Sequence, residues 1–194
     1  MLVLSSRSPT RQCLLTQFNI AFTVFHPDTD EEITAAENIS DSVQRLAYDK
    51  AQAAVATHPQ NLIIGCDTLL QVNEHTLGKP HTELSATHQL QLCSTQILTC
   101  YTGLCLLDSR SQHHQICVET YQVKFKALSA QMIQQYLAAD QPYQCAGSIK
   151  AESLGLTLFE WMRGDDFNTL LGLPLIRLNT MLLAAGYDVL QQQL

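Results

Sequence analysis

The chain begins with a short apolar segment that leads directly into a serine-rich turn and a proline, and this order strongly restricts the local fold. Residues 2–4 predict a buried strand, and Pro9 suits the first position of a helix, where its missing N–H is not needed. The first turn of a helix has unpaired backbone N–H groups, and the helix dipole adds positive charge there. The segment therefore predicts a phosphate-sized pocket at a helix N-terminus, with Arg11 in the first helical turn.

Strand-like and helix-like segments alternate along the first half of the chain, and a long hairpin follows in the middle. The patterns predict strands at 2–5, 22–26, 61–66, 68–72, 96–108, 115–127 and 156–162, and helices at 9–18, 41–57, 82–93, 129–139 and 172–186. Ser40 or Asp41 is suited to cap the second of these helices. This order predicts a mixed α/β fold in which the central hairpin belongs to a second lobe and a cleft separates the lobes.

The charge balance and the use of cysteine exclude several classes of protein. The net charge is -7 and there is no run of basic residues, which argues against a protein that grips nucleic acid. No apolar run approaches the roughly 18 residues of a membrane helix, and the N-terminus lacks the pattern of a signal peptide. Seven cysteines without C-x-x-C spacing predict neither a disulfide framework nor a zinc site. We therefore expect a cytoplasmic protein without a membrane segment.

Two groups of carboxylates are candidates for chemistry at a phosphorylated substrate. Asp67 follows an apolar strand, and carboxylates at the ends of strands in α/β sheets commonly face a ligand. Its possible roles are to bind a metal ion, to act as a general base, or only to cap a turn. The loop at 27–39 is strongly acidic, and Mg²⁺ could bind there if the loop converges with Asp67. The alternative is a solvated surface loop.

Basic residues are scarce, so their positions are informative. Arg11, Lys50 and Lys79 are the three of eleven that fall in segments with other candidate residues. Arg11 opposes the dipole of its predicted helix, a penalty that a bound anion would remove. Lys79 stands on a tight turn between a glycine and a proline, where it could contact a phosphate or lie on the surface. Lys50 lies late on the helix at 41–57, where solvated lysines are the common outcome.

Six short motifs follow one another along the chain. They are Ser6-Arg7-Ser8-Pro9-Thr10-Arg11, Asp30-Glu31, Asp49-Lys50-Ala51, Gly65-Cys66-Asp67, Gly78-Lys79-Pro80 and Thr102-Gly103. In this order they resemble the Maf family of nucleoside triphosphate pyrophosphatases. Further matches lie near the C-terminus, at 145–148, 152, 155, 164–166 and 172–175. The resemblance covers essentially the whole chain, and it implies a single Maf-like domain over 1–194 with a Maf/ITPase-like mixed sheet and flanking helices.

The segment at 145–160 looks closest to the 7-methyl-GTP-hydrolysing branch of this family. The dTTP/UTP branch typically has Gln where this chain has Glu152. Three positions depart from the family patterns. Gln12 replaces the second Arg of the opening motif, and Thr10 stands where the 7-methyl-GTP branch often has Trp and the other branch Arg. Thr68 stands where the 7-methyl-GTP branch often has Gln and the dTTP/UTP branch Thr.

The resemblance implies an enzyme that hydrolyses the bond between the α and β phosphates of a nucleoside triphosphate. In this scheme Asp67 activates water and, with Glu31, binds a divalent cation, Mg²⁺ or Mn²⁺. The triphosphate would be held by Ser6, Arg11, Lys50 and Lys79, and the base would be recognised by Thr10, Thr68 and Glu152.

Other interpretations stay open at this point. The first is a dTTP/UTP pyrophosphatase of the same family. The second is a non-catalytic, nucleotide-sensing regulator of cell division, although a sensor has no need of the water-activating base and the lysine that this chain retains at Asp67 and Lys79. The expected partner is the nucleotide alone, without nucleic acid or membrane, and a homodimer is a candidate assembly.

Overall fold

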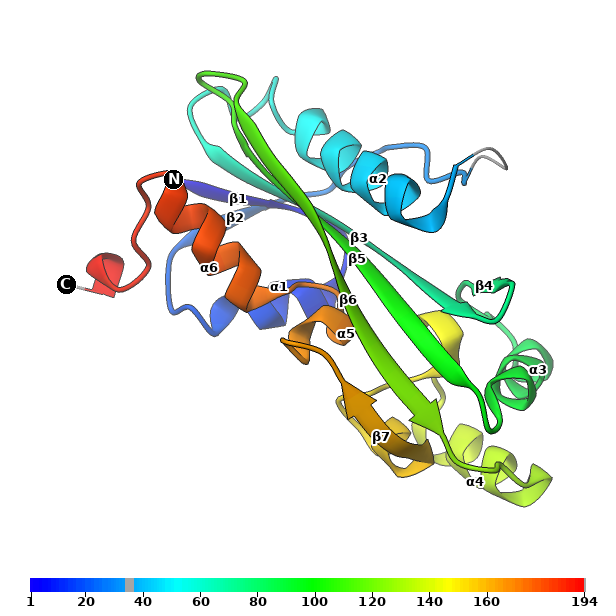
Figure 1. Cartoon of the computed structure of the whole chain (residues 1–194). Coiled ribbons are helices and arrows are strands. Elements are labelled where there is room, and N and C mark those ends of the chain that lie inside the picture. Colours follow the sequence, from blue (N-terminus) through cyan, green and yellow to red (C-terminus); the bar gives the residue numbers. More distant parts are fainter. Residues whose placement is uncertain (34–36, 194) are drawn as a thin grey trace. The chain divides into compact units, whose positions relative to one another are not determined.

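The computed structural model describes residues 1–33 and 37–193, within which seven strands form one mixed sheet (Figure 1). The strand order is β2-β1-β3-β5-β6-β7, and β4 pairs with β3. The strands are β1 Leu2–Ser5, β2 Phe22–Phe25, β3 Leu62–Val72, β4 His75–Leu77, β5 Ile97–Asp108, β6 His114–Phe125 and β7 Phe159–Arg163. The helices are α1 Pro9–Thr16, α2 Ile39–Ala53, α3 Glu83–Cys93, α4 Ala130–Asp140, α5 Asn168–Leu171 and α6 Leu175–Ala184. The predicted mixed α/β class with flanking helices is confirmed.

The chain divides into two compact units. The first comprises Met1–Thr68, Tyr101–Glu119 and Asp166–Leu194, and the second comprises Leu69–Cys100 and Thr120–Asp165. The central hairpin therefore contributes to both units. The single domain and the cleft stay predictions.

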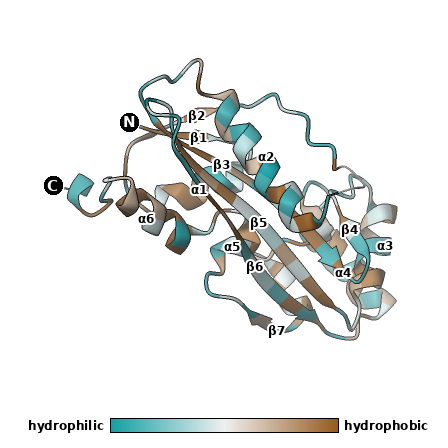
Figure 2. Cartoon of the chain, turned by 45° about the horizontal axis from the view of Figure 1, so that its top comes forward, coloured by the Kyte–Doolittle hydropathy of each residue, from teal (hydrophilic) through white to brown (hydrophobic). Residues whose placement is uncertain are grey.

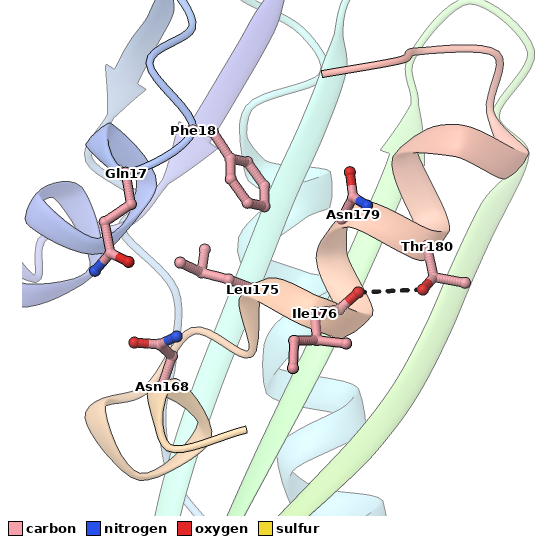
Figure 3. A pocket seen from close by; sticks show the side chains of 7 residues that line it. All are labelled: Gln17, Phe18, Asn168, Leu175, Ile176, Asn179 and Thr180. Carbon is pink, nitrogen blue, oxygen red and sulfur yellow. Dashed lines mark hydrogen bonds between the residues drawn. The ribbon is translucent and has the colours of Figure 1, made fainter. Parts of the chain in front are cut away.

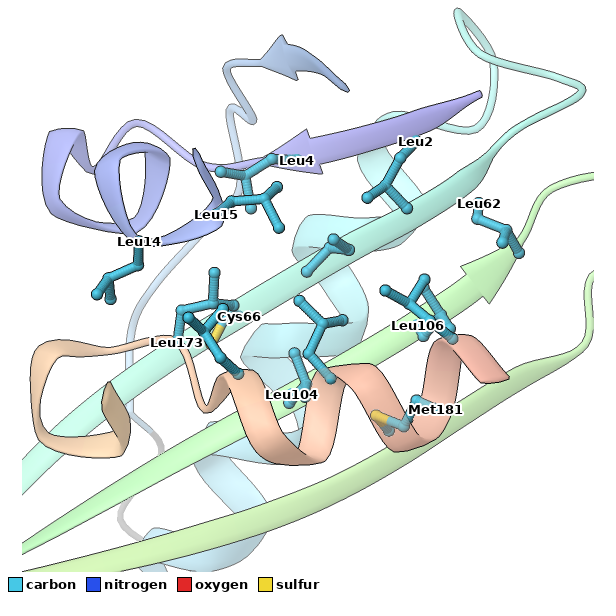
Figure 4. Close-up of a cluster of buried hydrophobic side chains, with 14 of the residues drawn as sticks. Leu2, Leu4, Leu14, Leu15, Leu62, Cys66, Leu104, Leu106, Leu173 and Met181 are labelled. Carbon is cyan, nitrogen blue, oxygen red and sulfur yellow. The ribbon is translucent and has the colours of Figure 1, made fainter. Parts of the chain in front are cut away.

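The first unit has two apolar layers, one on each face of its strands. β1 pairs in parallel with β2 and β3. Successive side chains of a strand point to opposite faces of the sheet. Leu and Ile side chains on one face pack under α1 and α6, as Figure 4 shows. On the other face Val3, Ile63 and Leu107 pack against Ala47 and Ala51 of α2 and against Ala54, its C-cap. Figure 2 shows the apolar colour along these strands and hydrophilic residues on the visible side of α2.

Two glycines allow α2 to lie directly on the strands. A Cβ added at Gly65 of β3 would stand 2.1 Å from the carbonyl oxygen of Ala47, and one at Gly103 of β5 would stand 2.0 Å from that of Val43. Both distances are far shorter than an ordinary van der Waals contact, so the backbone of α2 can approach this closely only where the strands carry no side chain. The approach fixes the depth at which residues of α2 reach the sheet.

The second unit is built around antiparallel pairs. β3 and β4 form the predicted hairpin, with Val72 opposite His75, and Asn73 in the turn has a positive φ of 51°. β6 pairs with β7, and the rings of Phe125 and Phe159 meet edge to face at 5.1 Å. α3 packs against α4, whose N-cap is the predicted Ser129.

Several predicted boundaries are wrong. The strands expected at 61–66 and 68–72 are one strand, β3, which continues through Asp67. α2 begins at Ile39 because Asn38, not Ser40 or Asp41, is its N-cap and accepts a hydrogen bond from the backbone N–H of Asp41. The first part of the strand expected at 156–162 is a 3-10 helix, Leu154–Leu158, and α5 was not predicted. Part of the predicted acidic loop, residues 34–36, lies outside the described residues.

The seven cysteines differ in their burial. All seven are free thiols, and Cys66, Cys93, Cys100 and Cys105 are buried whereas Cys13 is exposed. Among the described residues, the helices are all too short or too polar to cross a membrane.

Candidate active site

The serine-rich turn after β1 is closed by its own hydroxyl groups. Ser6 is buried, and its Oγ accepts a hydrogen bond from the backbone N–H of Ser8 at 3.1 Å. Ser8 is the N-cap of α1, and its Oγ accepts from the backbone N–H of Arg11 at 3.3 Å. These two N–H groups already have hydrogen-bond partners. An anion bound at this turn would therefore need more hydrogen bonds from side chains than the sequence predicted. Thr10 lies half-buried in the first turn of α1.

A compact ion-pair cluster in the first unit joins three of the predicted site residues. The Nζ of Lys50 lies 2.5 Å from Oδ1 of Asp67 and 2.7 Å from Oε1 of Glu31. Lys50 and Asp67 are buried, whereas the side chain of Glu31 is 63% exposed. The alternative interpretation of Lys50 as an ordinary solvated lysine is therefore wrong. Its helix lies so close to β3 at Gly65 that the lysine is enclosed between the helix and the strand that carries Asp67.

One oxygen of each carboxylate contacts the same ammonium nitrogen of Lys50, so the two carboxylates lie on neighbouring sides of this group. Carboxylate oxygens are the ligands that Mg²⁺ prefers, usually one or two of them together with water and phosphate oxygens. Glu31 and Asp67 fit this requirement. Within the described residues no group of three or more His, Cys, Asp and Glu side chains could hold a metal ion, so substrate or water oxygens would have to complete the coordination.

Two further acidic residues near the predicted motifs have structural contacts. Oδ1 of Asp30 accepts a hydrogen bond from the backbone N–H of Glu32 at 2.9 Å, within the acidic loop. Asp166 is buried, and its two carboxylate oxygens accept from the backbone N–H groups of Asn168 and Ile176, each at 2.9 Å. Asp166 thus joins the beginnings of α5 and α6.

Arg11 is held by a hydrogen-bond network in the first unit. Its Nε donates to the carbonyl oxygen of Gly172 at 2.7 Å, and its Nη2 donates to Oγ1 of Thr68 at 2.9 Å. The Oγ1 atoms of Thr68 and Thr102 lie 3.1 Å apart, and Thr102 donates to the carbonyl oxygen of Thr169 at 2.8 Å. Sequence reasoning identified Arg11 and Thr68 as site residues but gave no role to the other three. For Thr102 the available signal was its place in the Thr102-Gly103 motif.

Lys79 lies in the second unit, on the predicted tight turn, and is exposed. The turn is fixed through the carbonyl oxygen of Gly78, which accepts from the backbone N–H of Gly147 at 3.1 Å and from Nε2 of Gln89 at 3.0 Å. The amide oxygen of Gln89 accepts in turn from Oγ of Ser148 at 2.6 Å. Lys79 thus follows a residue whose backbone is tied to the segment at 146–148.

Glu152 also lies in the second unit, on an exposed loop. Its neighbours anchor the loop to the end of α4. Oγ of Ser153 donates to Oδ1 of Asp140 at 2.9 Å, and the backbone N–H of Lys150 donates to the hydroxyl of Tyr136 at 3.0 Å. Burial raises the pKa of the Tyr136 hydroxyl, so this group remains protonated across the physiological range.

A separate pocket of about 440 Å³ lies in the first unit beside α6 (Figure 3). Its lining consists of Gln17, Phe18, Asn168, Leu175, Ile176, Asn179 and Thr180. No residue of this lining is charged, so the pocket does not suit a triphosphate. The charged cluster around Lys50 is the better candidate for phosphate chemistry.

The mixed sheet with its flanking helices carries a buried lysine in contact with two carboxylates, a set of groups able to bind phosphate oxygens and a divalent cation. The family described as Maf-like protein matches residues 1–185, and the chain belongs to this family. The resemblance inferred from the six motifs is thereby confirmed.

Curated relatives match over nearly the whole chain. Three of them are named 7-methyl-GTP pyrophosphatase. The protein of Pseudoalteromonas translucida is 45% identical over 99% of this chain and 95% of its own length, and that of Nitrosococcus oceani is 44% identical over 97% and 95%. The protein of Pseudomonas aeruginosa is 42% identical over 97% and 98%. Among solved structures, the Staphylococcus aureus Ham1 protein aligns over 64% of this chain and 71% of its own, with 12% identity and a TM-score of 0.43, too low to establish a common fold.

Proposed function

We propose that this chain is a nucleoside triphosphate pyrophosphatase that hydrolyses the α–β phosphate bond of 7-methyl-GTP to the monophosphate and pyrophosphate. The name shared by relatives that are 42–45% identical over nearly their whole length is the observation that carries the proposal. The cluster of Lys50, Asp67 and Glu31 supports it, because it combines a possible base with groups suited to a triphosphate and a cation.

The cluster suggests how the chain's own residues would act. The contact with Lys50 fixes one oxygen of Asp67, and its carboxylate can accept a proton from a water molecule at the α–β linkage. The new bond forms between the water oxygen and the α phosphorus, the bond from this phosphorus to the bridging oxygen breaks, and pyrophosphate leaves with the electron pair. The proton removed from water resides on Asp67 until it returns to solvent. Glu31 and Asp67 would hold a divalent cation, Mg²⁺ or Mn²⁺, which offsets the charge of the phosphates when bound.

The remaining predicted residues take the roles that the family resemblance implies. Ser6, Arg11, Lys50 and Lys79 would bind the phosphates. Thr10, Thr68 and Glu152 would select the base, where a carboxylate favours the positive charge of an N7-methylated guanine.

A substrate panel tests the proposal. Wild-type protein is assayed with Mg²⁺ and with Mn²⁺ on 7-methyl-GTP, GTP, dTTP, UTP and CTP, and both products are identified. We expect pyrophosphate as the second product and the highest kcat/KM for 7-methyl-GTP. Orthophosphate from every substrate would refute the bond assignment, and a tenfold lead of UTP or dTTP would assign the chain to the other branch.

Asp67→Asn separates an enzyme from a nucleotide sensor. An enzyme should lose about 100-fold or more in kcat, the scale expected when a general base is removed, while nucleotide binding persists. Binding of nucleotide by the wild type without any turnover would favour the sensor.

Two substitutions test base selection. Glu152→Gln should lower kcat/KM for 7-methyl-GTP more than for UTP, because only the methylated base carries a positive charge. Thr10→Trp should widen the preference for the methylated base, since an aromatic ring stacks well on a cationic one. Equal effects on both substrates would remove these residues from the base site.

We also propose a cytoplasmic location and leave a homodimer as the assembly to be tested. The free thiols of the fold are compatible with a reducing compartment. Cell fractionation tests the location, and light scattering of the purified chain tests the assembly.

A further inference from the structure

The buried hydroxyl of Thr102 ends the hydrogen-bond network that begins at Arg11. We propose that Thr102 is a positioning residue that sets the orientation of the Arg11 guanidinium through Thr68, an inference that rests on the proposed function for its effect on turnover. Thr102 itself is fully buried, so it cannot contact a substrate and can act only through its neighbours.

The direction of the hydrogen bonds in this network follows from proton counting. Thr102 has one hydroxyl hydrogen, and the carbonyl oxygen of Thr169 can only accept, so that hydrogen points to Thr169. The bond between the two threonine hydroxyls must then be donated by Thr68. This assignment turns a lone pair of Thr68 toward Nη2 of Arg11, which donates to it at 2.9 Å.

The network and a second contact hold Arg11 to one short segment. The acceptor of Thr102 is the carbonyl of Thr169 in α5, and the acceptor of the Arg11 Nε is the carbonyl of Gly172, directly after α5. Two N–H groups of the guanidinium are thereby bound at fixed points, and a guanidinium has five. These two contacts define the plane of the guanidinium and leave three of its N–H groups to donate to a phosphate.

Loss of the Thr102 hydroxyl would release this constraint. The Thr68 hydroxyl would no longer have its acceptor, so its hydrogen could turn toward other groups and its lone pair away from Arg11. The guanidinium would then keep only the contact of Nε with Gly172. A contact aimed at a phosphate loses effectiveness when its donor is displaced by an ångström or less.

Thr102→Val removes the hydroxyl and preserves the shape of the side chain, and Thr102→Ser restores the hydroxyl. The matched control is Thr23→Val, because the Thr23 hydroxyl is also buried in the first unit but has no hydrogen-bond partner in the described part of the chain. We expect Thr102→Val to lower kcat/KM about tenfold. Thr102→Ser and Thr23→Val should stay within about twofold of the wild type.

A double-mutant cycle with Arg11→Ala distinguishes positioning from a general structural effect. If Thr102 acts through Arg11, Thr102→Val should change kcat/KM by less than about twofold in the Arg11→Ala background. An equal tenfold loss in both backgrounds, or a Thr102→Val variant as active as the wild type, would overturn the proposal. The melting temperature of each variant verifies that it is folded.

A spectroscopic readout does not depend on turnover. The ¹H–¹⁵N resonance of the Arg11 Nε–H, identified by its loss in Arg11→Ala, should shift or broaden in Thr102→Val and return in Thr102→Ser. An unchanged resonance would contradict the positioning role. If the wild type shows no turnover on any nucleotide, the proposed function fails, and this resonance alone decides whether Thr102 orients Arg11.

Discussion

The approach of α2 to the sheet at Gly65 predicts that a single methyl group there disrupts both stability and activity. In Gly65→Ala the new Cβ would stand 2.1 Å from the carbonyl oxygen of Ala47 and 2.7 Å from the backbone nitrogen of Ala51. Ordinary contact begins near 3.4 Å, so the helix must retreat by more than 1 Å. Both opposing atoms are backbone, which cannot rotate away as a side chain can.

The size of the effect follows from this geometry. Overpacking costs typically 1–3 kcal/mol, and we expect about 3 kcal/mol here because the clash is with backbone. For a chain of this length, that lowers the melting temperature by roughly 6–12 °C. Lys50 lies between Ala47 and Ala51 in the sequence, so its 2.5 Å contact with Asp67 should open by a similar distance. A misplacement of this size costs about 100-fold in turnover.

Thermal unfolding and steady-state release of pyrophosphate measure the two effects. Gly78→Ala is the control for stability, because a Cβ at Gly78 has no atom within 4 Å and Gly78 has no positive φ. Its free energy of unfolding should change by less than about 1 kcal/mol. A Gly65→Ala variant that melts within about 2 °C of the wild type would show that α2 is not held as argued.

Substitutions at three further residues probe the first unit. Lys50→Met leaves the buried Asp67 without its cation and should lower the free energy of unfolding by about 3 kcal/mol in urea titrations. Lys50→Arg should lose less, and added Mg²⁺ should recover part of the stability that Lys50→Met loses. Asp166→Ala removes acceptors from two helix starts and should cost about 1–2 kcal/mol, which an unchanged urea midpoint would contradict. Burial raises the pKa of the Cys66 thiol from near 9 to about 11, so the folded state retains a proton that the unfolded state loses. This thiol alone should therefore lower the free energy of unfolding by roughly 3 kcal/mol between pH 9 and 11. Cys66→Ser keeps a hydroxyl donor without titrating in this range and should show a smaller alkaline loss in urea unfolding at each pH.

The sequence predicted the elements well because most of them are marked by local signals. Pro9 and Ser129 stand at the starts of helices as expected, and the turn at Asn73 closes the predicted hairpin. The predicted start of α2 is wrong because several neighbouring residues could serve as its N-cap. Asn38, Ser40 and Asp41 are all good N-caps, and only the folded chain shows which one supplies the bond.

The site was predicted less completely because its geometry depends on tertiary contacts. The family resemblance named Lys50, Asp67 and Glu31, but no pattern in the helix at 41–57 distinguishes a solvated lysine from one enclosed against a strand. That distinction depends on Gly65, which only the folded structure places beneath α2. Thr102 was named as part of a family motif but received no role for a related reason, since its hydrogen-bond partners come from segments that meet only in the folded chain.

The distribution of the seven thiols has a practical consequence. Cys13 is the exposed one, and it stands on α1 two residues after Arg11, whereas four others are enclosed in the core. Burial also raises the pKa of Cys117 to about 11 and that of Cys145 above its ordinary value, so these two partly covered groups hold little thiolate at neutral pH. A maleimide fluorophore should therefore attach to the natural sequence at one position, next to the arginine proposed to bind phosphate. The native chain thus carries its own attachment point for an optical reporter of nucleotide binding.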